Sequence, residues 1–229
     1  MLAPFEHLFD DVPVGMSQSA ADRHGERLRF ARLVEPVTLA ADQLLPVLPP
    51  LAQLLPYGGL RRGAVVTVSG SLRLALALAA GVTQAGLWAA VVNVPELGVV
   101  AAAETGSALQ RLALIPNPGT QWARVAATLL DAVDLVVIRP PATGGQAVGR
   151  QLATRAREHR SVLVALGAWP SPDLNLYVHH EPWIGIEAGA GHLQQRRARV
   201  IITGRGSATR PREARLWLPF RDGTVQPAT

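Results

Sequence analysis

One segment, residues 57–80, constrains the fold of this chain more than any other. A turn rich in Gly and Arg, residues 57–63, is followed by Ala64-Val65-Val66-Thr67-Val68, a run that predicts a buried β-strand. Ser69-Gly70-Ser71 then predicts a tight turn, and the apolar residues 72–80 predict a helix. Strand, glycine turn and helix in this order are typical of a phosphate-binding loop, and they predict an α/β fold.

The turn at Gly70 lacks what a nucleotide-binding loop needs. Such a loop reads G-x-x-x-x-G-K-[ST], because backbone N–H groups wrap the phosphates, the Lys reaches the terminal ones and the hydroxyl binds the metal ion. Here only Ser71 and Leu72 separate Gly70 from Arg73, and Leu74 stands in place of the Ser or Thr. All 22 Lys and Arg residues of the chain are Arg. We therefore expect neither ATP binding nor a cofactor at this turn.

Two further apolar runs, residues 88–94 and 134–138, predict buried strands, with alanine-rich helical stretches between them. The second run stands where a Walker B strand would end in an acid that holds the metal, yet the next residue is Arg139, which would repel a cation. Glu96 is the only acid near the place of a catalytic Glu. A lone Glu after a strand is more often a solvated loop residue or a helix cap, so we expect no catalytic set.

These segments resemble the RecA/RadA core: residues 58–66 resemble its start, residues 132–138 its Walker B strand, and residues 201–219 its late β-meander. Within this group, the chain is similar to the actinobacterial ImuA-type proteins, often written ImuA-prime, of the translesion-synthesis mutasome. The phrases that carry this similarity are Leu109-Gln110-Arg111-Leu112-Ala113-Leu114-Ile115-Pro116, Trp183-Ile184-Gly185-Ile186-Glu187-Ala188-Gly189-Ala190-Gly191 and Ile202-Thr203-Gly204-Arg205-Gly206. The similarity extends over roughly residues 45–220 and lies in the order of the segments rather than in one motif.

The resemblance implies a RecA-like α/β core with a mostly parallel central sheet flanked by helices, a C-terminal antiparallel extension and a degenerate nucleotide-binding loop. It implies a non-catalytic adaptor without a cofactor, acting in the SOS response and in damage-induced mutagenesis. The implied partners are ImuB, which is an inactive Y-family polymerase homologue, an error-prone C-family DNA polymerase reached indirectly, and single-stranded DNA or RecA. Two alternatives stay open: a cell-division inhibitor of the SulA type and a RecA-like NTPase with an atypical loop.

Length and composition agree with a single α/β core. The chain has 229 residues, of which 48% are hydrophobic and 17% charged, enough apolar content to bury one sizeable core. We expect a flexible arm with a short helix over residues 1–44 and the RecA-like domain over residues 45–229. There is no Cys, so disulfides and thiolate metal sites are excluded. The start of the chain lacks the features of a secretory leader, so we expect a cytoplasmic protein without membrane contact.

The positive charge is concentrated in the last third of the chain. Residues 1–149 hold 10 Arg against 11 acids, whereas residues 150–229 hold 12 Arg against 6 acids. A basic stretch of this kind favours an acidic protein surface or a nucleic-acid backbone as a partner. We expect the partner-binding or DNA-binding residues to be Arg196, Arg197, Arg199, Arg205, Arg210, Arg212 and Arg215.

Other candidates for chemistry are weak. His179-His180 and His192 have no acid at a metal-ligand spacing, and adjacent histidines on an extended segment point to opposite faces. Ser69-Gly70-Ser71 does not match the G-x-S-x-G pattern of a nucleophile elbow. Asp131 and Asp134 precede a predicted strand, where acids commonly cap and solvate. We expect no metal site and no catalytic nucleophile.

Overall fold

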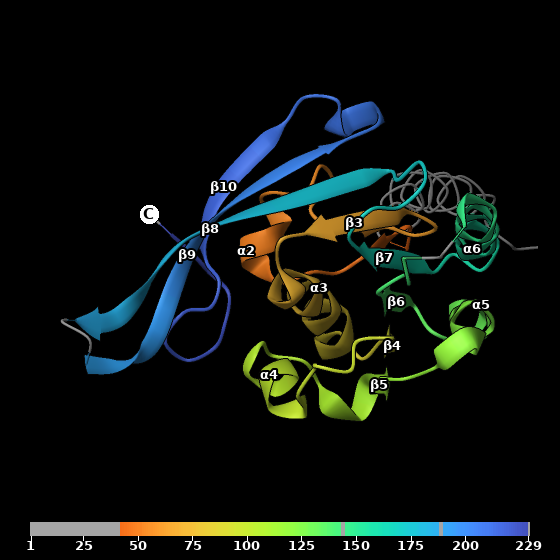
Figure 1. Ribbon diagram of the computed structural model, residues 1–229. Coiled ribbons are helices and arrows are strands. Elements are labelled where there is room, and N and C mark those ends of the chain that lie inside the picture. Colours follow the sequence, from red (N-terminus) through yellow and green to blue (C-terminus); the bar gives the residue numbers. More distant parts are fainter. Residues whose placement is uncertain (1–41, 143–144, 188–189, 229) are drawn as a thin grey trace, which may run out of the picture. The chain divides into compact units, whose positions relative to one another are not determined.

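The computed structural model of the protein describes residues 42–142, 145–187 and 190–228. The arm and short helix predicted within residues 1–44 therefore lie almost wholly outside the described residues. From Leu44 to Thr229 the chain forms one compact unit built on a nine-stranded sheet (Figure 1). Across the sheet the strands are β11 (Gln226–Pro227), β10 (Arg212–Trp217), β9 (Ala190–Gly204), β8 (Leu174–Glu187), β3 (Val65–Ser69), β7 (Val162–Leu166), β6 (Leu135–Ile138), β4 (Ala89–Val92) and β5 (Leu112–Ile115).

The half of the sheet from β8 to β5 is parallel throughout. Its strands β3, β4, β6 and β7 are short and consist mostly of Val, Leu, Ile and Ala, with almost every residue buried, as expected for strands covered on both faces. The strands predicted over residues 64–68, 88–94 and 134–138 are confirmed as β3, β4 and β6. β4 is shorter than predicted because Asn93 adopts a positive φ of 59° and leaves the strand.

Helices cover both faces of the parallel half. α3 (Leu72–Gln84) and α4 (Val99–Glu104) contact each other on one face, while α5 (Trp122–Ala132) and α6 (Gln146–Glu158) pack together on the other (Figure 1). Successive residues of a strand point to opposite faces, so Val66 and Val68 join the core against α3. Val65 joins the core against α5 and α6. None of the described helices is long and apolar enough to cross a membrane.

α3 occupies the centre of its face of the sheet. The helix predicted over residues 72–80 is confirmed and extends four residues further, to Gln84, with every residue from Leu74 to Thr83 buried. Ser71 caps its N-terminus, accepting a 3.3 Å hydrogen bond from the backbone N–H of Leu74. Gly81 lets the chain near β1 (Leu44–Leu45) cross the helix closely, because a Cβ there would lie 2.4 Å from the Cα of Val47.

The other half of the sheet is an antiparallel extension. β8 is parallel to β3 but antiparallel to β9, and β10 and β11 continue the antiparallel order. The β-meander predicted over residues 201–219 is confirmed in part, because β10 lies within this range and the end of β9 overlaps it. The hairpin that β9 forms with β8 was not predicted at its full length: β8 has 14 residues and β9 has 15. The fold is thus α/β, with a mostly parallel sheet flanked by helices and a C-terminal antiparallel extension.

Candidate functional site

The turn between β3 and α3 is closed by β8. Gly70 has φ of +90°, and a Cβ on it would lie 2.4 Å from the carbonyl oxygen of Val178 on β8. Only glycine fits here, both for its backbone angle and for this close approach. Because Ser71 already caps α3, a single residue separates the strand from the cap, and the backbone has no length with which to wrap a triphosphate.

His180 covers the same turn from β8. Its Nε2 lies 3.0 Å from the carbonyl oxygen of Gly70, and since a carbonyl only accepts, Nε2 is the donor. Burial lowers the pKa of His180, the positive charge of Arg196 lowers it further, and the bond to Gly70 opposes both. His179, one residue earlier, is exposed, so the two histidines point to opposite faces as predicted.

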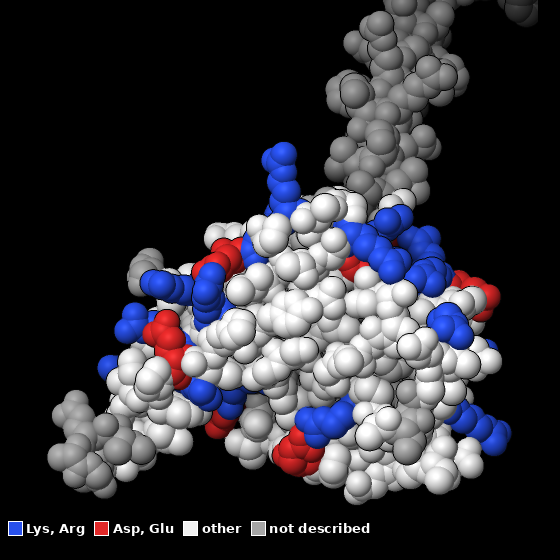
Figure 2. Space-filling view, turned by 45° about the horizontal axis from the view of Figure 1, so that its top comes forward, with Lys and Arg blue, Asp and Glu red and all other residues white. Residues whose placement is uncertain are grey.

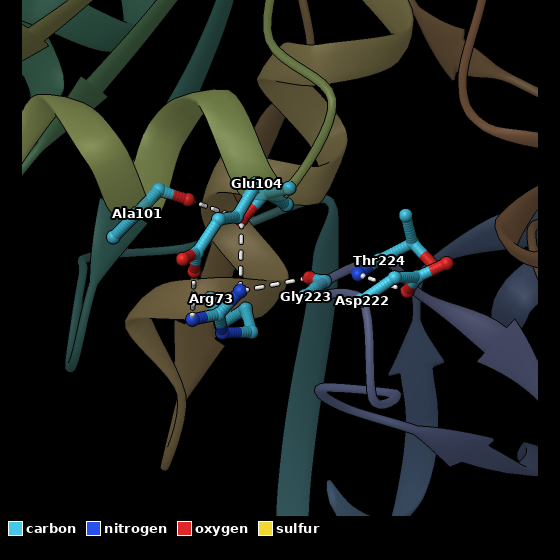
Figure 3. Close-up of polar contacts among 7 residues, drawn as sticks. Arg73, Ala101, Glu104, Asp222, Gly223 and Thr224 are labelled. Atoms are coloured by element: carbon cyan, nitrogen blue, oxygen red, sulfur yellow. Dashed lines mark hydrogen bonds and ion pairs between the residues drawn. The ribbon is translucent and has the colours of Figure 1, made fainter. Parts of the chain in front are cut away.

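Arg73 does not point toward the Gly70 turn. Its Nη1 donates hydrogen bonds to the carbonyl oxygen of Gly223 at 2.8 Å and to Oγ1 of Thr105 at 3.3 Å, and its Nη2 lies 3.6 Å from Oε2 of Glu104 (Figure 3). These partners come from the end of α4 and from the loop between β10 and β11. Arg73 stands at the position of the phosphate-binding Lys, but its guanidinium links the start of α3 to the end of α4 and to the loop between β10 and β11.

Arg139 and Glu96 form an ion pair at the carboxyl ends of β6 and β4. The pair is completed by Asn93, whose side-chain amide donates a 2.7 Å hydrogen bond to the carbonyl oxygen of Arg139. The pKa of Glu96 is lowered by a hydrogen bond from its own backbone and by the Arg139 guanidinium. Glu96 is thus an exposed residue of the loop after β4, as expected, and it pairs with the arginine that follows β6.

Three charged residues at the carboxyl edge of the parallel strands are thus engaged in contacts within the protein. In parallel sheets this edge is the usual place of ligands and catalytic groups. Here its charged residues, Arg73, Glu96 and Arg139, are all bound to other residues of the chain. Within the described part of the chain, no three His, Cys, Asp or Glu side chains come together in a way that could hold a metal ion.

The arginines of β9 are held along the β8–β9 hairpin. Arg196 donates a 2.7 Å hydrogen bond to the carbonyl of Glu181 and lies 5.6 Å from the centre of the Trp183 ring. Arg197 lies 3.4 Å from the Glu181 carboxylate and 5.2 Å from the centre of the Trp217 ring. Arg199 makes a bidentate pair with Glu213 on β10, at 2.5 and 2.6 Å, which lowers the pKa of that carboxyl.

The other predicted arginines lie elsewhere on the surface. Arg212 donates a 3.3 Å hydrogen bond to the carbonyl of Leu55, Arg210 and Arg215 are exposed, and Arg205 lies at the far end of β9. Arg215 stands directly opposite Arg199 in the β9–β10 register. The seven arginines are thus distributed from one end of the antiparallel strands to the other.

Arg205 joins a groove that the sequence analysis did not identify. The cavity has a volume of about 440 Å³ and is lined by residues from four segments, among them Tyr57, Arg61, Arg62, Arg157 and Arg205. It lies where β3 and β8 begin, at the opposite end of β3 from Gly70. The Gly/Arg turn at residues 57–63 was a visible signal, but nothing in the sequence indicated that α6 and the end of β9 would meet it.

Asp131 and Asp134 are structural. Asp134 accepts from Arg62 at 2.9 Å and from the backbone N–H of Trp88 at 3.0 Å, which ties the turn before β3 to the start of β6. Asp131 accepts a bidentate pair from Arg155 of α6 at 2.6 and 2.5 Å, and this bond lowers its pKa. A second cavity, of about 700 Å³, lies beside this pair between α5 and α6.

Comparison with known proteins places the parallel half of the molecule in a family. Residues 53–171, from the end of α2 (Pro49–Ala52) to the loop before β8, match the model described as the MT3502 N-terminal domain. The chain is also 43% identical, over 123 residues, to the "Uncharacterized protein Rv3395c" of Mycobacterium tuberculosis (strain ATCC 25618 / H37Rv). That match spans 51% of this chain and 59% of the length of the relative. Because the family model covers more than half of the chain and includes Gly70, Arg73, Glu96 and Arg139, the chain belongs to the MT3502 N-terminal domain family.

Proposed function

We propose that the protein is a non-catalytic, RecA-like adaptor in DNA-damage-induced translesion synthesis. In this role it binds an ImuB-type homologue of Y-family polymerases and through it supports an error-prone C-family DNA polymerase. The observation that carries the non-catalytic part is the set of contacts at the carboxyl edge of the sheet. The turn at Gly70 lies against β8, Arg73 is bound to Gly223 and Thr105, and Arg139 is paired with Glu96.

These contacts support a role without nucleotide chemistry, because they engage Arg73 and Arg139, the two cations that stand at the positions of the Walker motifs. ATP hydrolysis needs a cation at the phosphates, a hydroxyl and an acid for the metal, and donors that stabilise the charge of the transition state. The chain has Arg73 turned toward α4, Leu74 in place of the hydroxyl and Arg139 in place of the acid. The strand, the glycine turn and the buried helix of a phosphate-binding loop are present, but the side chains that act on a nucleotide are replaced. We therefore favour a binding role over a catalytic one.

The architecture supports the RecA-like part of the proposal. A parallel sheet with helices on both faces, continued by antiparallel strands after β8, is the arrangement that the resemblance implied. The assignment to translesion synthesis rests on the phrases shared with ImuA-type proteins at residues 109–116, 183–191 and 202–206. The first of these includes β5, and the other two lie on or beside the β8–β9 hairpin.

The β8–β9 hairpin has the chemistry of a protein-binding surface. Trp183 and Ile184 are each 38% exposed, Leu193 is 51% exposed, and Arg196 lies over the Trp183 ring. Tryptophan and arginine contribute most often to the binding energy of protein interfaces, while exposed large apolar side chains on one element mark an interaction site. We place the ImuB contact on this hairpin and on the arginines of β9.

The test is co-purification of the full chain with an ImuB-type homologue, in the absence of nucleotide. We expect a complex that added ATP and magnesium do not change, and that the pair Trp183→Ala and Arg196→Ala weakens. The matched control is Trp88→Ala with Arg111→Ala, which removes another arginine that lies over a tryptophan, at 5.2 Å, away from the hairpin. Capture of FtsZ in place of the ImuB homologue would favour the SulA alternative, and ATP turnover by pure protein would favour the NTPase alternative.

A further inference from the structure

The groove at the start of β3, here called the arginine groove, gathers positive charge from distant parts of the chain. Arg61 comes from β2 (Leu60–Arg61), Arg62 from the next turn, Arg157 from the last turn of α6 and Arg205 from the end of β9. Figure 2 shows arginines gathered at the upper right of one face with few acids among them, on the side where α6 lies in Figure 1. Such a gathering is expected to attract an anion.

Three of these guanidinium groups have no ion-pair partner in residues 42–142, 145–187 and 190–228. Among the described residues, Arg61, Arg157 and Arg205 make no ion pair, whereas Arg62 is fixed by Asp134 at 2.9 Å. Of the described residues that line the groove, Asp173 is the single acid, and its Oδ2 already accepts a 2.8 Å hydrogen bond from the backbone N–H of Val65. Within the part of the chain that the structure describes, the groove therefore presents an excess of positive charge.

The groove also offers an aromatic face. Tyr57, in the same lining, is 56% exposed, so its ring is accessible to a ligand in the groove. The volume of about 440 Å³ falls within the range of small-molecule sites and suits one nucleotide unit rather than a whole folded partner. Arginines that follow a phosphate backbone beside an aromatic ring on which a base stacks are the general design of single-strand binding sites.

We propose that the arginine groove binds a single strand of nucleic acid, with Arg61, Arg157 and Arg205 on its phosphates and Tyr57 stacked on a base. An acidic peptide would satisfy the arginines equally, but it would make no comparable use of the exposed ring. The groove lies at the amino ends of β3 and β8, away from the Gly70 turn and from Trp183 and Ile184 of the hairpin. The inference therefore goes beyond the adaptor role and does not depend on the ImuB contact.

Fluorescence anisotropy of the full chain with a labelled oligo-dT of about 16 nucleotides tests the proposal. The groove variant is Arg61→Glu with Arg205→Glu. The matched control is Arg150→Glu with Arg210→Glu, two exposed arginines outside the groove, and both double variants lower the net charge of +5 by four. We expect the groove variant to bind at least about tenfold more weakly, with a salt slope reduced by about 2, and the control to bind nearly as the original chain does. Tyr57→Ala should weaken binding about fivefold.

Several results would overturn the proposal. One is failure of oligo-dT to bind the original chain. Another is a control that loses as much affinity as the groove variant, which would mean that net charge alone governs binding. If a poly-glutamate peptide competes fully, and Tyr57→Ala has no effect on either ligand, then the groove takes an acidic protein instead. The groove variant should still co-purify with the ImuB homologue, because the hairpin that we propose for that contact is unchanged. This measurement distinguishes failure of the nucleic-acid proposal from failure of the proposed function.

Discussion

The side chain of Arg73 donates a 2.8 Å hydrogen bond to the carbonyl oxygen of Gly223, a residue 150 positions further along the chain. The same guanidinium contacts Thr105 and Glu104 at the end of α4. Gly223 has φ of +84°, and a Cβ on it would lie 2.6 Å from the Cβ of Glu104, so the C-terminal loop packs directly on α4. One arginine at the start of α3 thus joins the parallel half of the sheet to the antiparallel extension.

Replacement of Arg73 by Ala should loosen this junction. The side chain is 24% exposed, so its hydrogen bonds are partly shielded from water, and their loss should lower the free energy of unfolding by about 2 kcal/mol. Urea denaturation measures this change. Arg150→Ala, at an exposed position of α6, is the control and should change stability by less than about 0.5 kcal/mol. Equal stability of the two variants would mean that Arg73 contributes nothing at this junction.

The sequence predicted the strands and the central helix because each is a local pattern. Short runs of Val and Ile predicted β3, β4 and β6, and the apolar residues 72–80 predicted α3. The length of the β8–β9 hairpin was missed, since polar and charged residues such as His179, His180 and Arg199 alternate along it without a long apolar run. An antiparallel hairpin gains its stability from cross-strand pairs, which a single strand does not reveal.

For the carboxyl edge of the sheet, the sequence predicted which residues stand at the key positions but not which residues they contact. The short turn at Gly70 and the positions of Arg73 and Arg139 could be predicted from their spacing alone. Their partners could not, because Gly223 and Glu96 lie 150 and 43 residues away in the chain and meet them only through the fold. The arginine groove was missed for the same reason.

Isothermal titration of the pure protein with ATP and magnesium should give no binding with a dissociation constant below about 100 μM, which corresponds to about 5.5 kcal/mol. The variant Arg73→Lys should behave in the same way. A lysine at this position does not lengthen the turn, supply the missing hydroxyl or remove Arg139 from the place of the acid. Tight binding by Arg73→Lys alone would show that the side chain at position 73, rather than the turn, prevents nucleotide binding.

Leu76→Asp should prevent folding. Leu76 is 2% exposed in the middle of α3, and an unpaired carboxylate there should cost about 4 kcal/mol or more. We expect insoluble protein. Val100→Asp on α4, where the side chain is 71% exposed, should stay soluble and folded by circular dichroism. Soluble, folded Leu76→Asp protein would be incompatible with the position of α3 in the core.

Protonation of His180 should destabilise the fold. Burial lowers its pKa in the folded state, so below the ordinary histidine value of about 6.5 the unfolded chain binds the proton first. The contribution of His180 to stability is therefore complete above about pH 6.5 and is lost as the pH falls. Urea denaturation between neutral and mildly acid pH should show a smaller fall in the free energy of unfolding for His180→Gln than for the exposed control His179→Gln. If the free energy of unfolding depends on pH in the same way in both variants, His180 is not the source of the stability loss at acid pH.

The triple reversal of Arg196, Arg197 and Arg199 to Glu should leave the fold intact and weaken the ImuB contact. Arg197 and Arg199 make exposed ion pairs with Glu181 and Glu213, and such pairs contribute little to stability. Their reversal places like charges side by side on the hairpin, which should repel an acidic partner and make the remaining binding less sensitive to salt. Circular dichroism and co-purification with the ImuB homologue at two salt concentrations measure both effects.

The same triple variant separates the two proposed surfaces. If the hairpin binds protein and the arginine groove binds nucleic acid, the triple variant should lose the ImuB homologue and keep oligo-dT. Arg61→Glu with Arg205→Glu should do the reverse, because both residues line the groove beside the last residue of β9, whereas Arg196 lies in the middle of that strand. Loss of oligo-dT by the triple variant would place nucleic acid on the hairpin. If the triple variant keeps both ligands, the three arginines of β9 contribute to neither contact, and the ImuB homologue must bind another face of the protein.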